Sequence, residues 1–392
     1  MGIDEIFRAL GDPTRREVLR LLGGRYMIRF PLRRAAALAT CLLVGASLPG
    51  HGLAAATAHQ PAGSTSRQVT LMSGPDRIYG TLELPTHTAG RRVPGVLLIA
   101  GSGSVDRNGN EPALNLDHMN TLRSFAGVLA RAGVASLRYD KLGTGRTGHA
   151  TRQDPSEIGF DLYLGEARAA YHFLATRPEI DPHRLIILGH SEGGLVALIL
   201  ASESLRDPAP RVLVLAAPPG LPILETIREQ VARALIQQVQ NQQITQAQAD
   251  AALADLDRII AQLKATGTIP SDIRTPGLAT IFNPTNARYL TQEERYDPRT
   301  LATQVPRGLP VLVLHGKKDS QVTEADDKGL LSAFRSSGHD SAVLYDLANV
   351  DHVFKEVPGP PNPNPLVDYN NPALPFSRAA GRRLAAFLAA HL

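Results

Sequence analysis

The chain has 392 residues, 43% of them hydrophobic and 20% charged, which suffices for one large folded domain with an insertion or for two domains. Its net charge of +4 comes from residues 1–58, which hold eight Arg and four acidic residues, while residues 59–392 are neutral overall. A neutral main part offers no electrostatic basis for binding nucleic acid, and the single cysteine, Cys41, excludes an intrachain disulfide framework and a cysteine-rich metal site.

Residues 1–24 have the pattern of a helix start, with Asp12 able to cap a helix and Pro13 at its first position. They resemble a fragment of the ArsR-type winged-helix repressors. Because the fragment includes no recognition helix, we expect no DNA-binding domain and no nucleic-acid partner. We interpret residues 1–26 as a remnant, or as sequence upstream of a true translation start at Met27; if they are translated, a cytoplasmic location follows.

Residues 27–58 have the three parts of a secretory signal peptide: a basic start, an apolar run over 35–48, and small residues at 56–58. The apolar run spans about 14 residues, too few to cross a membrane, so we expect no stable membrane anchor. A buried core helix is the alternative, which the following glycines and alanines disfavour. The pattern predicts cleavage near Ala58 and a periplasmic or secreted protein.

From residue 66 onward, predicted strands and helices alternate. Strands are expected at 68–72, 78–84, 93–100, 134–139, 185–188, 212–216, 311–314 and 342–347. Helices are expected at 122–132, at 160–176, and from Ser377 to the C-terminus. Continuous apolar runs separated by helices predict an α/β fold, with a mostly parallel sheet covered by helices on both faces. We assign residues 59–219 and 306–392 to this core.

Residues 220–305 interrupt the alternation and are predicted to be helical. Apolar residues recur every fourth position from Ile223 to Val239, and a capping box at residues 245–248 opens a second helix. The insertion leaves the sheet on the side where open α/β folds bind ligands, so we expect a helical cap over the site. A peripheral helical hairpin is the alternative.

The sequence at 189–193, Gly-His-Ser-Glu-Gly, follows a predicted strand and precedes helix-forming residues. In this context the pattern predicts a nucleophile elbow, in which a tight turn raises the hydroxyl of Ser191 above the sheet. The backbone N–H of Glu192, at the start of the helix, is then expected to be one donor of an oxyanion hole.

A serine nucleophile needs a base and a group that orients the base. Asp319 lies on the loop after the strand at 311–314, and His352 follows the strand at 342–347, which is the expected chain order Ser, acid, His. Two alternatives are that Asp319 only caps a loop and that Asp351 orients a base. His190 and His315 are interpreted as structural residues.

The loop at 100–110 is rich in small residues and follows the strand at 93–100. Its backbone can approach a substrate carbonyl, and the Ser102 N–H is our second predicted oxyanion-hole donor. A dinucleotide site is disfavoured because the G-x-G here is not completed to G-x-G-x-x-G. The turn at 138–146 is interpreted as a structural turn near the site.

These motifs together resemble the α/β-hydrolase superfamily over residues 66–392, and within it the bacterial serine esterases and serine-aminopeptidase-like members. The resemblance implies an α/β-hydrolase fold, a Ser191–Asp319–His352 triad, a small-molecule substrate, and neither a metal nor an organic cofactor. Residues 357–375 depart from the pattern with seven prolines directly after the histidine. They are either a stiff rim of the site or an exposed loop.

We predict a serine carboxylesterase that works through an acyl-enzyme intermediate. The nearest alternative is a peptidase or amidase with the same triad, which an acidic cluster in the cap would favour. Candidates for such a cluster are Glu225, Glu229, Asp250 and Asp255, although we favour the interpretation that they form a solvated helix face. A non-catalytic binding or regulatory protein is suggested only by residues 1–24. The sequence does not predict the oligomeric state.

Overall fold

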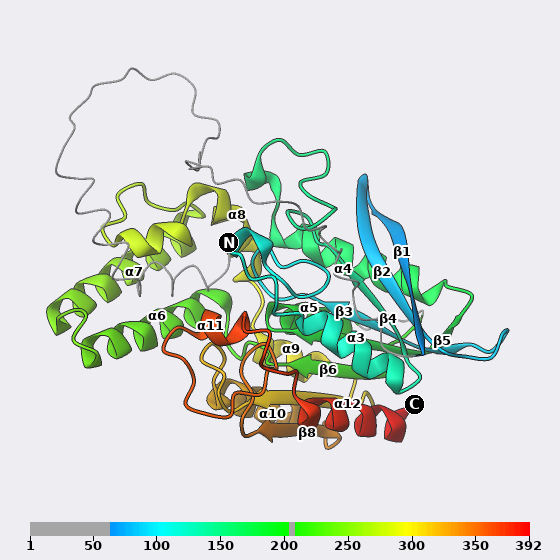
Figure 1. The fold of residues 1–392 in the computed structure, drawn as a ribbon. Coiled ribbons are helices and arrows are strands. Elements are labelled where there is room, and N and C mark those ends of the chain that lie inside the picture. The colour runs from blue at the N-terminus through cyan, green and yellow to red at the C-terminus, as the bar shows by residue number, and fades with distance from the viewer. Residues whose placement is uncertain (1–62, 204–207) are drawn as a thin grey trace, which may run out of the picture. The chain divides into compact units, whose positions relative to one another are not determined.

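A mostly parallel sheet of eight strands forms the centre of the computed structural model, which describes residues 63–203 and 208–392 (Figure 1). The strand order is β1-β2-β4-β3-β5-β6-β7-β8. The first two pairings, β1 with β2 and β2 with β4, are antiparallel, and the others are parallel. The strands are β1 (Ser64–Ser73), β2 (Asp76–Pro85), β3 (Val93–Ile99), β4 (Ala135–Tyr139), β5 (Ile180–His190), β6 (Val212–Ala216), β7 (Val311–Gly316) and β8 (Ala342–Leu347).

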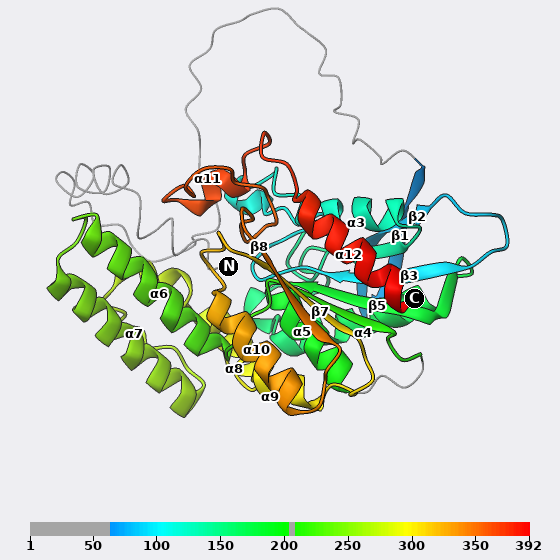
Figure 2. The ribbon, with the colours of Figure 1, turned by 90° about the horizontal axis from the view of Figure 1, so that it is seen from below.

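Helices cover both faces of this sheet, because side chains along the central strands alternate between two apolar layers. Leu97 and Ile99 of β3 belong to one buried cluster, and Val96 and Leu98 to the other. The first layer is completed by α4 (Phe160–Ala175), α5 (Glu192–Ser202), α9 (Pro298–Gln304) and α10 (Glu324–Ser336), and the second by α3 (Thr121–Arg131) and α12 (Arg378–His391). Figure 2 shows these two groups on opposite sides of the strands.

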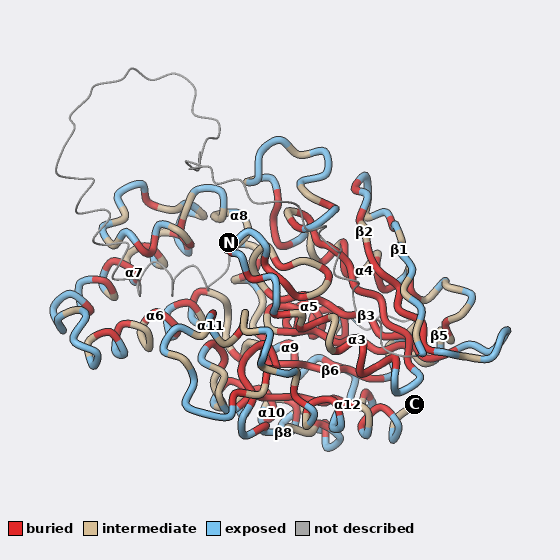
Figure 3. Tube along the Cα trace, viewed as in Figure 1, coloured by how far each residue is buried: buried red, intermediate tan, exposed pale blue. Residues whose placement is uncertain are grey.

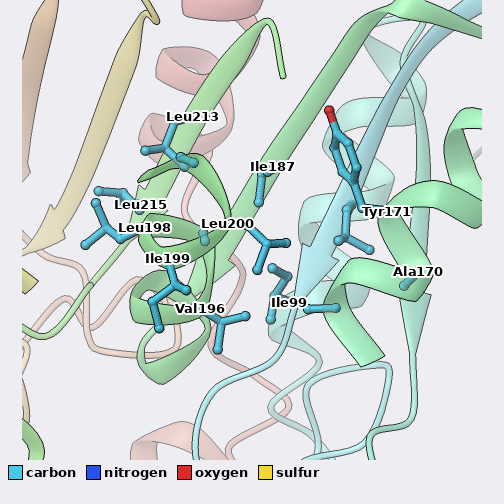
Figure 4. Packing of buried hydrophobic residues seen from close by; sticks show 14 of the residues in the cluster. Ile99, Ala170, Tyr171, Ile187, Val196, Leu198, Ile199, Leu200, Leu213 and Leu215 are labelled. Carbon is cyan, nitrogen blue, oxygen red and sulfur yellow. The ribbon is translucent and has the colours of Figure 1, made fainter. Parts of the chain in front are cut away.

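The first apolar layer encloses α5, the helix that follows the Gly-x-Ser-x-Gly motif. Its residues 192–201 are all buried, which is why this helix is apolar all round rather than amphipathic. Figure 4 shows Val196, Ile199 and Leu200 of α5 among side chains of β3, β5 and β6. Among the described residues, the central strands and α5 form a continuous buried region (Figure 3). A helix held in this way gives its first turn a fixed position.

The insertion between β6 and β7 has an apolar cluster of its own, separate from the two layers on the sheet. It contains α6 (Ile223–Gln240), α7 (Gln246–Thr266) and α8 (Ala287–Glu293), and its fully buried members include Leu256 and Ile259. Thr245 caps α7, with Gln248 closing the predicted capping box. The described residues all belong to one compact unit, so the division into core and cap stays a prediction.

The predicted fold class is confirmed, and the predicted strands and helices are found with shifts of one to a few residues at their ends. The largest difference is β5, which begins five residues earlier than predicted, at Ile180. Helix α10 was missed, although Thr323 and Asp326 form a capping box and Leu330, Leu331 and Phe334 form its buried face. The short α11 (Pro365–Tyr369) was missed as well.

The predictions for residues 1–26 and 27–58, including the signal peptide and Cys41, lie outside the described residues. Among the helices of the described residues, none combines the length and the apolar character that a membrane span requires.

Candidate active site

Ser191 lies between the last residue of β5 and the first residue of α5, with φ 55° and ψ −127°. A non-glycine residue rarely adopts this conformation, and strain of this kind clusters at functional sites. A Cβ at Gly189 would lie 1.9 Å from the Gly193 carbonyl oxygen, and a Cβ at Gly193 would lie 2.4 Å from that of Ile99. Both glycines are therefore sterically required, and the predicted tight strand-to-helix turn is present.

The structure places Asp319 against His352, with 2.7 Å between Asp319 Oδ2 and His352 Nδ1. Asp319 Oδ1 also accepts hydrogen bonds from the N–H groups of Gln321 (2.7 Å) and Val322 (3.0 Å). Burial alone would raise the pKa of Asp319, but the charge and hydrogen bond of His352 and the two N–H groups lower it below its usual value. The carboxylate is thus charged at neutral pH and fixes the imidazole with Nδ1 protonated.

Ser191 and His352 line one small cavity of about 20 Å³, together with Gly101, Ser102 and Gln321. The structure therefore brings together the predicted nucleophile, the predicted base and the predicted oxyanion loop, although they are far apart in the sequence. A Cβ at Gly101 would lie 3.1 Å from Ser191 Cβ, so the loop after β3 passes directly beside the elbow. The N–H of Glu192 belongs to the first turn of α5, where no intrahelical acceptor exists.

Asp351 does not orient the imidazole in this structure. Its Oδ1 accepts a hydrogen bond from the N–H of Lys355 (2.7 Å) and so closes the turn that carries His352. Burial raises the pKa of Asp351 to about 7. The alternative assignment of Asp351 as the orienting acid therefore loses its geometric basis, and Asp319 keeps that role in the predicted triad.

The two other histidines near the sheet edge have structural partners. His190 Nε2 donates a hydrogen bond to the backbone carbonyl of His352 (2.8 Å), and burial lowers the pKa of His190 to about 3, so its ring is neutral. His315 Nδ1 lies 2.6 Å from Asp327 Oδ2. The contact of His190 positions the backbone of His352, a role that no sequence pattern indicates because the residue before the serine in G-x-S-x-G is variable.

The turn after β4 is tied to the oxyanion loop through Asp140. The Asp140 carboxylate accepts hydrogen bonds from the N–H groups of Arg107 and Arg146, both at 2.8 Å, and pairs with the Arg107 guanidinium. A Cβ at Gly145, where φ is +47°, would lie 2.3 Å from Asp140 Cγ. The interpretation of residues 138–146 as a structural turn agrees with these contacts.

Four polar residues near the predicted site were not identified from the sequence: Lys141, Glu166 and Glu293, which are buried, and Tyr289, which is half-buried. Glu166 of α4 accepts a hydrogen bond from the N–H of Leu142 (3.0 Å) and thus holds the same turn. Glu293 of α8 is 1% exposed, and its Oε2 finds no hydrogen-bond partner among the described residues. Burial, and then the charge of Glu192, raise the pKa of Glu293 well above its ordinary value.

A larger cavity of about 190 Å³ lies beside the predicted oxyanion loop, and Ser102 lines both this cavity and the small one that Ser191 lines. Its walls come from the core and from the insertion and are largely apolar. The apolar wall residues are Leu142, Pro155, Ile158, Ile223, Ile227, Ile281 and Leu290. Glu192, Tyr289 and Glu293 are among the polar groups. The insertion therefore contributes directly to the space beside the predicted nucleophile.

The acidic cluster proposed for an amine-binding cap is not assembled in the structure. Glu225, Glu229 and Asp250 are exposed on α6 and α7, and none of them lines the larger cavity. Asp255 is buried, but its carboxylate accepts hydrogen bonds from the N–H groups of Arg274 and Thr275 and pairs with Arg258. The carboxyl groups that do line the cavity are those of Glu192 and Glu293.

The proline-rich segment at 357–375 has two parts. Residues 358–361 are exposed, whereas α11 packs beside the triad, with the ring of Tyr369 centred 6.3 Å from that of His352. Leu366 and Tyr369 are buried with Met119 and Val353. The second part is therefore a rim of the site, and the first part is an exposed loop. No group of His, Cys, Asp and Glu suited to hold a metal is found in the described part of the chain.

Comparison with known proteins agrees with this geometry. A family model described as "Serine aminopeptidase, S33" (Hydrolase_4) matches residues 116–348. An esterase of Pyrococcus furiosus has a similar structure, with a TM-score of 0.51, 13% identity, and coverage of 83% of this chain and 91% of the esterase. A proline iminopeptidase of Mycobacterium smegmatis gives a TM-score of 0.50 and 16% identity, covering 83% and 98% of the two chains. No curated protein matches the sequence significantly.

The buried carboxyl of Glu166 predicts a pH-dependent stability. Burial raises its pKa from 4.5 to about 8, so the folded state favours the protonated form. A raised folded pKa adds stability that is complete below the unfolded pKa and is lost as the pH rises through the folded pKa. Gln cannot ionise and keeps an acceptor for the Leu142 N–H. Thermal unfolding at pH 5, 7 and 8.5 should therefore show Glu166→Gln gaining on the wild type as pH rises.

The exposed Glu157 provides the control, because Glu157→Gln removes a carboxyl from the surface. Parallel melting-temperature profiles for wild type and Glu166→Gln across this pH range would contradict the assignment of a neutral Glu166.

Proposed function

The chain belongs to the S33 serine aminopeptidase family of α/β-hydrolases and is a serine hydrolase, and we propose that its reaction is the hydrolysis of carboxylic esters of small molecules. The proposed nucleophile is Ser191, with His352 as general base and Asp319 as the acid that orients it. The observation that carries this proposal is the 2.7 Å contact between Asp319 Oδ2 and His352 Nδ1 beside the strained Ser191 elbow.

In the proposed reaction, His352 Nε2 takes the proton from the Ser191 hydroxyl as its oxygen attacks the ester carbonyl carbon. The tetrahedral intermediate collapses when the imidazolium gives this proton to the departing alkoxide oxygen, and the acyl group remains on Ser191. A water molecule, activated by the same imidazole, then hydrolyses the acyl-enzyme. Asp319 remains ionised throughout and stabilises the imidazolium, in keeping with its lowered pKa.

The negative charge on the tetrahedral oxygen is assigned to the N–H groups of Glu192 and Ser102. Support comes from the position of Glu192 in the first turn of α5 and of Ser102 in the wall that it shares with Ser191. Losing one donor of this kind typically costs ~3 kcal/mol of transition-state stabilisation. The proposed site therefore depends on the backbone of the loop at 101–104 as much as on the triad.

An ester substrate suits the larger cavity better than a substrate recognised by its free amine. The cavity wall is mostly apolar, and burial raises the pKa of its Glu293 well above the ordinary value, which favours the neutral form of this carboxyl. The carboxylate of Glu192 is engaged by Lys141 and Tyr289. We also propose that the insertion, residues 220–305, acts as a cap that selects the acyl or alcohol group, because it supplies a large part of this wall.

Aminopeptidase activity is the second candidate, and Glu293 is the observation that favours it. A carboxyl group buried in the cavity, with one oxygen that has no hydrogen-bond partner among the described residues, would bind an α-ammonium group if it ionised on substrate binding. The fold does not choose between the two activities, since the two similar structures named above are an esterase and an iminopeptidase.

A substrate panel tests both candidates. We expect the wild type to hydrolyse p-nitrophenyl esters of increasing acyl length faster than aminoacyl p-nitroanilides, because the cavity wall is mostly apolar and burial of Glu293 disfavours its charged form. Ser191→Ala should lower ester turnover by at least about 10⁴-fold, since triad members act as a unit. The matched control is Ser202→Ala, which changes a serine at the far end of α5.

Undiminished ester turnover by Ser191→Ala would refute the nucleophile. A preference for aminoacyl anilides that Glu293→Gln removes would replace the esterase proposal with the aminopeptidase one.

We further propose, on the pattern of residues 27–58 alone, that the enzyme is exported. Expression of the full chain in a Gram-negative host should place its ester-hydrolysing activity in the periplasmic extract or the medium, with a mature N-terminus near residue 59. Activity confined to the cytoplasm, on a chain that keeps residues 1–26, would contradict export.

A further inference from the structure

Lys141 is a buried cation beside the proposed active site that neither the triad nor the substrate pocket explains. It is the second residue after β4, next to Asp140, and its side chain is 6% exposed. Its Nζ donates a hydrogen bond to the Gly101 carbonyl oxygen at 2.5 Å and lies 3.5 Å from Glu192 Oε1. The Tyr163 ring lies against the ammonium, with its centroid 4.9 Å from Nζ. Burying an ammonium is unfavourable unless such partners compensate it.

The first of these contacts bears on one predicted oxyanion-hole donor. The carbonyl of Gly101 and the N–H of Ser102 belong to the same planar, trans peptide group, so they point in opposite directions. A cation held on the carbonyl oxygen fixes the orientation of the N–H at the other end. It also polarises the group, because hydrogen bonds in series strengthen one another where the surroundings exclude water.

The second contact bears on the other predicted donor. Glu192 supplies its backbone N–H to the proposed hole, while its buried carboxylate points back to Lys141 and accepts a hydrogen bond from the Tyr289 hydroxyl. Tyr289 belongs to α8 of the insertion. Lys141 therefore contacts the residue before one predicted donor, Ser102, and the side chain of the other, Glu192. Through the hydrogen bond between Glu192 and Tyr289 it is also connected to the insertion.

The backbone on both sides of Lys141 is anchored, which gives its side chain a defined origin. On one side, the Asp140 carboxylate accepts an N–H hydrogen bond from Arg107 of the loop at 100–110 and another from Arg146 of its own turn. On the other side, the Leu142 N–H donates to Glu166, and the Leu142 carbonyl accepts from the Tyr163 hydroxyl at 3.1 Å. A lysine with four rotatable side-chain bonds would position nothing if its own backbone moved, so these anchors are what make a precise contact feasible.

We propose that Lys141 is a positioning residue of the oxyanion hole, which orients and polarises the Gly101–Ser102 peptide group and aligns Glu192. The assignment rests on the proposed serine-hydrolase mechanism. Its effect is greatest when negative charge develops on the substrate oxygen, because the ammonium and the polarised N–H both stabilise that charge. A purely structural counter-ion of Glu192 would instead affect folding stability alone.

The test compares Lys141→Met with the wild type on whichever substrate of the panel the wild type turns over best. We expect kcat to fall about 10- to 100-fold while KM changes less than about threefold, the signature of an interaction made mainly in the transition state. Inhibition by an alkyl trifluoromethyl ketone, whose serine adduct carries an oxyanion, should weaken by the same factor as kcat/KM. Lys141→Arg keeps a cation and should retain more activity than Lys141→Met.

Arg152→Met is the matched control, because it removes a largely buried cation from an ion pair with Asp76 outside the proposed hole. If Lys141→Met does not fold, Lys141→Gln carries the test; it keeps a donor for the Gly101 carbonyl but no charge, and should show the same kcat loss to a smaller degree. An unchanged kcat for Lys141→Met, or equal losses of kcat for Lys141→Met and Arg152→Met, would overturn the assignment of Lys141. The proposed serine-hydrolase mechanism would not be affected by that result, because the wild type would still be active. A wild type inactive on the whole panel would overturn both.

Discussion

The close packing of backbone at the Ser191 elbow is the constraint on which the rest of the site depends. Gly193 lies so near the Ile99 carbonyl that no side chain fits between them, so the end of β3, the end of β5 and the start of α5 meet at one point. The loop predicted to form the oxyanion hole follows β3 there, and Ser191, the predicted nucleophile, follows β5 there. The apolar layer around α5 holds this meeting point in place, and the strain at Ser191 persists because its surroundings are so tightly packed.

Several buried charged residues, among them Asp140, Lys141 and Glu192, contact one another near the elbow. Asp140 ties the turn after β4 to the oxyanion loop, and Lys141 joins that loop to Glu192. Buried ionic groups are seldom the most stable choice for a core, but they fix geometry when each has partners. We propose that these charges hold the backbone donors of the oxyanion hole. His352 has other contacts: its ring lies against Asp319, and its backbone carbonyl accepts a hydrogen bond from His190.

Much of this architecture could be predicted from the sequence, because its patterns are local. Apolar runs predicted the strands, the glycines around Ser191 predicted the turn, and positions after strands predicted Asp319 and His352. The buried residues Lys141, Glu166 and Glu293 and the half-buried Tyr289 could not be predicted, since a polar residue in a loop or helix has no local pattern that marks it as withdrawn from solvent. Likewise, the acidic residues on α6 and α7 were candidates for an amine-binding cluster. Three of them lie on the solvent-exposed faces of these helices, and a sequence without the packing partners of each helix does not show which face is exposed.

The central claim is that Ser191 is the one serine activated for attack. The most direct measurement is mass spectrometry of the folded protein after reaction with a fluorophosphonate, with the modified residue located from peptide fragments. The account predicts a single adduct on Ser191, none after heat denaturation, and none when Asp319→Asn and His352→Ala are combined. An adduct on another serine of the native protein, or no adduct on Ser191, would contradict it.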